Sequence, residues 1–263
     1  RDPEMSRGLG DVYKRQEFIR TGCEDSKFGF TMREDFAFKC VKDVLETPGV
    51  RLTGLHCHIG SQIFALHSFR EAIDVMIQFI KRINEEYDYE IEGLDLGGGL
   101  GIAYVKEEEP PTIESFAKLT CTAVKELCAE YGVKEPRIAV EPGRSIAATP
   151  GVTLYTVGIL KTLPGIRNIV AIDGGMSDNI RTALYGSKYE AFVVERADKP
   201  RDVICDIVGK HCESGDVVVK NAPLQACEAG DHICVLGTGA YCNEMASNYN
   251  KQVRPGIVFV RDG

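Results

Sequence analysis

The feature that most constrains the fold is a regular alternation of short apolar runs and long amphipathic segments in the first half of the chain. In the long segments, apolar residues recur with the period of a helix that buries one face. Strands that alternate with helices of this length are typical of parallel βαβ units, in which each helix crosses over one face of a sheet. The predicted helices are residues 33–46, 67–86 and 113–131, and the predicted strands are residues 50–56, 91–96 and 138–140.

Each predicted helix has one apolar face that we expect to lie in the core. Free cysteine packs as a small hydrophobic residue, so cysteines at apolar helix positions, namely Cys40, Cys121 and Cys128, are expected to pack in the same way. The other expected core residues are Phe36, Val41, Val44 and Leu45 in the first helix, Phe69, Ile73, Met76, Ile77, Ile80 and Ile83 in the second, and Phe116, Leu119, Ala123 and Leu127 in the third.

After about residue 148 the pattern changes to short β-branched runs separated by glycine, proline and aspartate, which indicates a mostly antiparallel β domain. One further helix is expected at residues 241–249. We therefore divide the chain into an α/β part, residues 17–148, and a β part, residues 149–263. Residues 1–16 show neither the apolar period of a helix nor that of a strand, and we interpret them as a non-native or disordered segment. The predicted strands of the β part are residues 152–161, 168–172, 203–208, 216–220 and 232–236.

Composition excludes several function classes. The formal net charge is -8, and lysine and arginine are scattered rather than clustered, which argues against nucleic-acid binding. No apolar stretch reaches the ~18 residues of a membrane span, and no signal peptide is visible. The 10 cysteines form neither a disulfide framework nor a paired CxxC zinc pattern. We therefore expect a cytoplasmic protein that binds neither nucleic acid nor membrane.

Clusters of glycine or polar residues follow the strands of the α/β part, where barrels and open sheets place their active sites. Gly97, Gly98 and Gly99 follow the second strand, and backbone N–H groups without side chains in the way can cradle a phosphate. A tight turn explains these glycines about as well, and the spacing of dinucleotide-binding motifs is not met.

The third strand leads into Glu141, Pro142, Gly143 and Arg144. A salt-bridged pair at the end of a barrel explains the acid and the base without any ligand. Alternatively, the carboxylate of Glu141 pairs with a cationic ring nitrogen, and the planar fork of Arg144 binds a phosphate or a carboxylate. These residues therefore suit a ligand that carries both a cationic ring and an anionic group.

Two histidines end the first strand. His56 and His58 flank Cys57 and are expected on one side of the strand. A metal pair is one interpretation, but no third ligand stands at a suitable spacing, so we predict no metal. We favour His58 as an imidazole that stacks on a ring, with Ser61 as a phosphate-binding hydroxyl.

The β part contains two further candidates. Cys212 and Glu213 lie in a turn between predicted strands, where they suit either a plain β-turn or a proton donor beside a carboxylate that clamps an amine. Arg181 and Tyr185 are one helical turn apart and can grip a carboxylate together.

Six segments occur in a fixed order along the chain and together resemble one enzyme family, the diaminopimelate decarboxylases. The family belongs to the alanine-racemase-like fold type, so the resemblance implies a pyridoxal-phosphate-binding TIM barrel followed by a mostly antiparallel β domain. The segments are GLHCHIGSQ (54–62), LDLGGGLG (94–101), EPGR (141–144), DGGMSDNIRTALY (173–185), CESGD (212–216) and GAYCNEMASNYN (239–250).

The resemblance also implies a role for each matched residue. His58 would stack on pyridoxal phosphate and Glu141 would pair with its ring nitrogen, while Cys212 would be the proton donor. The reaction would convert meso-diaminopimelate to L-lysine in a homodimer with shared active sites. The phosphate would be held by Ser61, Gly97, Gly98, Gly99 and Tyr241, with Pro142 and Gly143 beside them, and the substrate by Arg144, Arg181, Tyr185, Glu213 and Tyr241.

Departures from the family pattern limit these expectations. The family's cofactor-binding lysine lies in a motif like Tyr-Ala-x-Lys-Ala, which this sequence lacks, and Thr182 stands where the family usually has proline. We therefore expect a fragment of a longer enzyme, inactive by itself and prone to fold poorly. Two alternatives stay open, which are a related decarboxylase acting on ornithine, arginine or carboxynorspermidine, and a non-catalytic regulatory paralogue.

Overall fold

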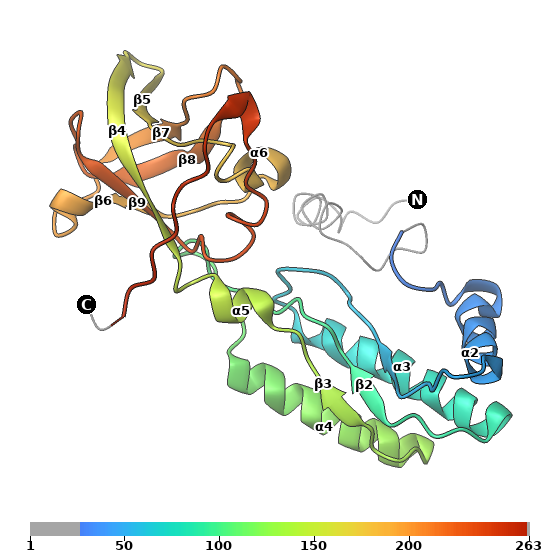
Figure 1. Ribbon diagram of the computed structural model, residues 1–263. Helices are drawn as coiled ribbons and strands as arrows, with labels where there is room; N and C mark the ends of the chain where they lie inside the picture. Colours follow the sequence, from blue (N-terminus) through green and yellow to red (C-terminus); the bar gives the residue numbers. More distant parts are fainter. Residues whose placement is uncertain (1–26, 262–263) are drawn as a thin grey trace, which may run out of the picture. The chain divides into compact units, whose positions relative to one another are not determined.

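The computed structural model describes residues 27–261, so the expectation for residues 1–16 lies outside the described residues. The described chain divides into two compact units. The first contains the residues up to Ala103 together with Glu109–Ser145, and the second contains Tyr104–Glu108 and the residues from Ile146 onward. Each unit has its own sheet (Figure 1).

The first unit is built on a three-stranded parallel sheet in the order β1-β2-β3. Leu55 pairs with Leu94, and Leu94 pairs with Ile138, so the three strands end at one edge of the sheet. β1 and β2 are shorter than predicted, because the ladder of backbone hydrogen bonds includes only three residues of each, whereas β3 has the predicted length and begins one residue earlier. The elements are η2 (Arg33–Asp35), α2 (Phe36–Glu46), β1 (Gly54–His56), α3 (Leu66–Tyr87), β2 (Gly93–Asp95), α4 (Ile113–Tyr131), β3 (Arg137–Ala139) and α5 (Gly143–Ala147).

The core of the first unit is formed by α3 and α4, which pack against each other and against the sheet (Figure 1). The helix faces predicted for α3 and α4 are confirmed, and the α3 isoleucines are fully buried. Two predictions were wrong. Phe36 is half exposed while Phe38 is buried and stacks on Tyr87, and Cys121 is exposed on α4. The buried α3 residues are Phe69, Ile73, Ile77, Phe79, Ile80 and Ile83.

The second unit is a six-stranded sheet in the order β6-β9-β4-β5-β7-β8. Every pairing is antiparallel except that of β5 with β7, which confirms the mostly antiparallel prediction. The outermost strands β6 and β8 contact each other, so the sheet is curled. The elements are β4 (Val152–Leu163), β5 (Arg167–Ile172), α6 (Arg181–Tyr185), β6 (Ala191–Val193), η3 (Val194–Arg196), β7 (Val203–Val208), β8 (Val217–Leu224), β9 (His232–Leu236) and η4 (Tyr249–Lys251).

The helix predicted at residues 241–249 does not form. Tyr241 has a φ of 63°, a left-handed conformation that cannot begin a right-handed helix. Turns follow it, and only the short 3-10 helix η4 lies at the end of the segment. Among the described residues, no helix is both long enough and apolar enough to cross a membrane.

A pH-dependent contact holds η3 to β9 in the second unit. Glu195 accepts hydrogen bonds from the backbone N–H of His232, at 3.0 Å, and from its Nδ1, at 2.6 Å. These bonds lower the pKa of Glu195 from 4.5 to about 2. A carboxyl whose pKa is lower in the folded state stabilises the fold above its unfolded pKa, and that contribution is lost as the pH falls from 4.5 towards 2.

We therefore expect Glu195→Gln to lower the denaturation midpoint of the second unit at pH 6. The difference from the wild type should shrink as the pH falls from 4.5 towards 2, because the carboxyl of the unfolded wild-type chain takes up a proton in this range before the folded one does. Urea titrations of both proteins between pH 7 and pH 2 measure this. A difference that stays constant over the whole range would contradict the assignment.

Candidate functional site

The strand ends of the first unit meet in a tightly packed glycine turn. A Cβ on Gly98 would lie 2.4 Å from the carbonyl oxygen of Glu141, and one on Gly97 would lie 2.5 Å from that of Cys57. The backbone N–H of Glu141 also donates to the carbonyl of Gly97, at 2.8 Å. The glycines are therefore required by the close approach of neighbouring backbone segments, whatever ligand they also bind.

His58 lies against this turn as a neutral imidazole. Its Nδ1 accepts a hydrogen bond from the backbone N–H of Gly98, at 3.2 Å, which places the ring proton on Nε2. Burial lowers the pKa of His58, the nearby charge of His56 lowers it further, and only Glu141 acts in the opposite direction. The ring is therefore held in one orientation and one tautomer.

The structure changes the expected pairing of the two histidines. His56 Nε2 lies 3.2 Å from Glu141 Oε2, and Asp95 completes a group whose ligand atoms all lie within 4.8 Å of one another. His58 is not part of this group. The sequence showed no third ligand at a suitable spacing, whereas the fold brings Asp95 of β2 and Glu141, which follows β3, to His56; the absence of a metal stays a prediction. Both His56 and Glu141 are more than half exposed.

Donors for an anion lie at the same edge. Arg144 is buried, with 6% of its surface exposed, and its Nη2 donates to Ser61 Oγ at 2.6 Å. Among the residues that the structure describes, none accepts a hydrogen bond from the N–H of Gly99, which follows directly after the packed turn. A hydroxyl, a guanidinium and an open backbone N–H form a donor set that suits a phosphate.

The second unit holds a buried cation in an aromatic cage. Arg181 is 7% exposed, and its guanidinium carbon lies 5.5 Å from the ring of Tyr185 and 5.4 Å from that of Tyr241. Its Nε donates to the hydroxyl of Tyr189, at 2.9 Å. Within residues 27–261 no carboxylate forms an ion pair with Arg181. Because a buried charge is costly without a counter-charge, this cage is suited to an anionic ligand.

Cys212 and Glu213 lie in the turn between β7 and β8, as predicted, and both are exposed. The hydroxyl of Tyr249 donates to Glu213 Oε1, and this bond raises the pKa of Tyr249. The ring of Tyr249 meets that of His211 edge to face at 5.3 Å, which fixes the position of the hydroxyl. The sequence interpretation missed Tyr249, whose role depends on a contact between distant segments.

Asp216 ties the Cys212 turn to the segment before α6. Its Oδ1 accepts the N–H of Met176 at 2.6 Å, and its Oδ2 accepts that of His211 at 2.7 Å. Gly175 and Gly209 leave room for the carboxylate, since a Cβ on either would lie within 2.8 Å of it. The segment that leads to Arg181 and the turn that carries Cys212 are therefore held by one buried carboxylate.

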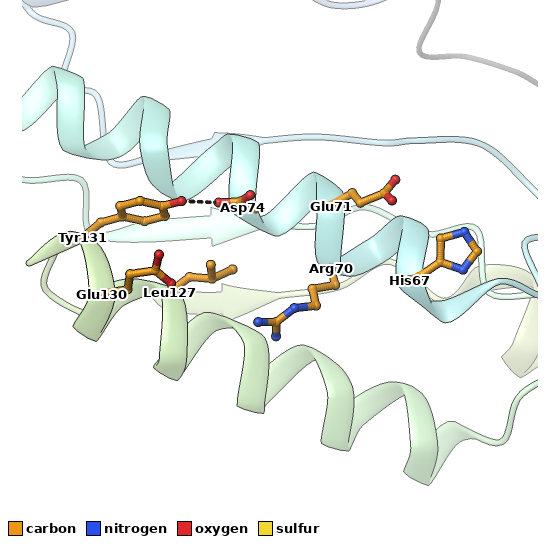
Figure 2. Close-up of a pocket in the computed structure, with 7 residues that line it drawn as sticks. All are labelled: His67, Arg70, Glu71, Asp74, Leu127, Glu130 and Tyr131. Atoms are coloured by element: carbon orange, nitrogen blue, oxygen red, sulfur yellow. Dashed lines mark hydrogen bonds between the residues drawn. The ribbon is translucent and has the colours of Figure 1, made fainter.

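A pocket of about 350 Å³ lies between α3 and α4, away from every predicted site residue. Figure 2 shows its lining, in which the hydroxyl of Tyr131 donates to Asp74 at 2.8 Å. Arg70, also in the lining, already pairs with Glu126 at 3.0 Å. Tyr131, Asp74 and Arg70 are thus engaged by partners within or beside the pocket, and no residue of the lining belongs to a predicted site.

The chain belongs to the pyridoxal-dependent decarboxylase family. Residues 9–148 match the family described as "Pyridoxal-dependent decarboxylase, pyridoxal binding domain". The match covers the first unit and its strand-end site, and the family's cofactor is pyridoxal phosphate. The donor set of Ser61, Arg144 and Gly99, with the imidazole of His58 and the carboxylate of Glu141, fits that cofactor.

Similar proteins of known identity support the family assignment. Diaminopimelate decarboxylase of Staphylococcus aureus (strain COL) is 45% identical over 248 residues, which cover 94% of this chain and 58% of that protein. The diaminopimelate decarboxylase of Bacillus subtilis (strain 168) is 43% identical over 247 residues, which cover 94% of this chain and 56% of that protein. The chain thus spans a little over half the length of these relatives.

Solved structures show the same fold. The diaminopimelate decarboxylase from M. jannaschii in co-complex with L-lysine superposes with a TM-score of 0.83 at 35% identity, covering 92% of this chain and 54% of that one. The diaminopimelate decarboxylase from Helicobacter pylori complexed with L-lysine gives a TM-score of 0.78 at 31% identity, and the match covers 89% of this chain and 55% of that one. The predicted fold class, part of a cofactor-binding barrel followed by a β domain, is confirmed.

Proposed function

We propose that this chain provides the cofactor-binding and substrate-binding residues of an enzyme that decarboxylates meso-diaminopimelate to L-lysine. The observation that carries the proposal is the buried Arg181 cage in the same unit as the exposed Glu213 carboxylate. A cation and an anion in one unit suit a substrate with both carboxylate and ammonium groups. Relatives that bear the name of this decarboxylase, and lysine complexes of two of them, support the same substrate class.

In this proposal the first unit holds pyridoxal phosphate. Bound there, the cofactor supplies an electron sink for the electron pair that remains when carbon dioxide leaves. Ser61, Arg144 and the open N–H of Gly99 hold its phosphate, at the turn that Gly97 and Gly98 begin, with Pro142 and Gly143 in the adjoining segment. His58 lies against the ring, and the carboxylate of Glu141 keeps the ring nitrogen protonated.

The second unit binds and protonates the substrate. Arg181, with the rings of Tyr185 and Tyr241, binds a carboxylate, and Glu213 binds the distal ammonium group. The thiol of Cys212, beside Glu213, delivers a proton to the carbon that has lost its carboxylate. A smaller substrate would leave Arg181 or Glu213 unpaired, which discriminates against it.

The proposal includes a homodimer in the cytoplasm. In this arrangement Cys212 and Glu213 reach the active site of the partner subunit, so each site uses residues of two chains. The nine cysteines within the described residues are free thiols, which suits a reducing compartment.

The test is a chimera that adds the unmatched terminal segments of the Staphylococcus aureus relative to residues 27–261 of this chain. Since the sequence contains no Tyr-Ala-x-Lys-Ala motif, we expect the 263-residue chain to release no carbon dioxide from meso-diaminopimelate. The chimera should release it and form L-lysine, and Cys212→Ala should reduce its kcat by about 10²–10⁴-fold, the usual contribution of a general acid.

Pyridoxal phosphate absorbance provides the control, because it shows whether the chimera is folded and loaded. A loaded chimera that is inactive on meso-diaminopimelate would refute the proposed function. Turnover by the 263-residue chain itself would refute the expectation that the missing motif is required.

A further inference from the structure

Among residues 27–261, Tyr189 accepts the one hydrogen bond that the guanidinium of Arg181 donates. The phenol is 3% exposed, and its hydroxyl accepts from Arg181 Nε at 2.9 Å. The ring of Tyr104 packs edge to face on Tyr189 at 5.3 Å, and Cys242 Sγ lies 3.6 Å from the hydroxyl. Tyr189 is therefore a rigid acceptor at the inner edge of the guanidinium.

This contact determines which donors of Arg181 remain for a ligand. A guanidinium presents its five N–H groups in a fixed fork, so a bond at Nε sets the direction of both terminal nitrogens. The rings of Tyr185 and Tyr241 lie near the same guanidinium and restrict its rotation. The Nη1 and Nη2 atoms are left as a pair, the geometry that binds a carboxylate through two parallel hydrogen bonds.

We propose that Tyr189 is a positioning residue that aims the terminal nitrogens of Arg181 at the carboxylate of an amino-acid ligand. The proposal rests on the proposed function, which supplies the carboxylate. A neutral phenol can orient the guanidinium without adding a charge, whereas a carboxylate at this position would neutralise Arg181 and compete with the ligand. Burial raises the pKa of Tyr189, so its hydroxyl stays neutral.

A purely structural role for Tyr189 makes a different prediction. If Tyr189 only fills space beside Tyr104 and Cys242, phenylalanine should replace it without consequence, because the ring contacts remain. If the hydroxyl orients Arg181, phenylalanine should release the Nε–H and weaken carboxylate binding while the fold stays intact.

The experiment follows the Arg181 Nε–H by NMR in the 263-residue chain and identifies its resonance by its loss in Arg181→Gln. The probes are L-lysine and cadaverine, which differ by one carboxylate. We expect a slowly exchanging Nε–H that shifts with L-lysine and not with cadaverine. Tyr189→Phe should accelerate the exchange at least about tenfold and raise the Kd for L-lysine about tenfold, the loss expected for one hydrogen bond to a charged group.

Tyr89→Phe is the matched control, since it removes a phenol that donates to the carbonyl of Leu52 in the first unit, and it should change neither quantity. Unchanged exchange and unchanged L-lysine affinity in Tyr189→Phe would overturn the positioning role. If Tyr189→Phe accelerates the exchange but the wild type binds neither probe, the orientation of Arg181 by Tyr189 stands and the proposed carboxylate site is rejected.

Discussion

Asp216→Ala is expected to lower the free energy of unfolding of the second unit by about 3 to 5 kcal/mol, since it leaves one buried and one partly buried N–H group without an acceptor. Both oxygens of this carboxylate are engaged, one by Met176 and the other by His211, and the side chain is 3% exposed. The backbone of Gly175 and Gly209 approaches the carboxylate so closely that a Cβ on either would lie within 2.8 Å of it. The loss should appear as faster hydrogen exchange of the β9 amides and of the segments at Met176 and His211.

Two comparisons define this experiment. Asp216→Asn keeps one carbonyl acceptor and the side-chain volume. It should therefore lower the free energy of unfolding by less than Asp216→Ala does, but still by more than about 1 kcal/mol. Asp198→Ala removes an exposed carboxylate that pairs with Lys199, and it should change stability by less than about 0.5 kcal/mol. Equal exchange rates in Asp216→Ala and Asp198→Ala would show that Asp216 does not hold the two segments together.

Gly98→Ala is expected to destabilise the first unit by about 2 to 3 kcal/mol, because overpacking between fixed backbone segments cannot relax by side-chain rotation. The added Cβ would lie 2.4 Å from the carbonyl oxygen of Glu141, and relieving that contact separates the second strand end from the third. The hydrogen bond from Glu141 to Gly97 should weaken with it. Hydrogen exchange of the α3 core amides reports the stability of this unit, with the second unit as an internal reference.

Gly143→Ala is the matched variant for this prediction. Gly143 lies next to the same site, but a Cβ there would have no heavy atom within 4 Å and its φ is not left-handed. Its stability should therefore equal that of the wild type within about 0.5 kcal/mol. If Gly98→Ala is as stable as Gly143→Ala, the strand ends are not packed as described.

The elements with local signals could be predicted from the sequence. The observed bounds of α4 are those predicted, residues 113–131. Thr112 caps the first turn by accepting a hydrogen bond from the backbone N–H of Ser115, and Gly132 ends the helix in a left-handed conformation. By contrast, the helix predicted at residues 241–249 fails at Tyr241, and Gly239 just before it is packed against Ala147. That packing joins distant parts of the chain, which a local pattern cannot reveal.

The same distinction applies to the site. Residues within a motif, such as Glu141 and Arg144, could be proposed from their types and their place after a strand. The contacts that hold the site residues in place join pairs 40 and 85 residues apart, such as Asp216 with Met176 and His56 with Glu141. Tyr189 was missed because only the fold shows that its hydroxyl meets Arg181.

The central claim is that these residues recognise a substrate with two amino-acid ends. The most direct test is the ratio of kcat/KM for meso-diaminopimelate to that for L-ornithine in the pyridoxal-phosphate-loaded chimera. L-ornithine lacks the distal carboxylate and leaves the buried Arg181 unpaired, so we expect a ratio above about 10⁴ in the wild type and a fall of at least tenfold in Arg181→Gln. A ratio near one, or a preference for L-ornithine, would contradict the account.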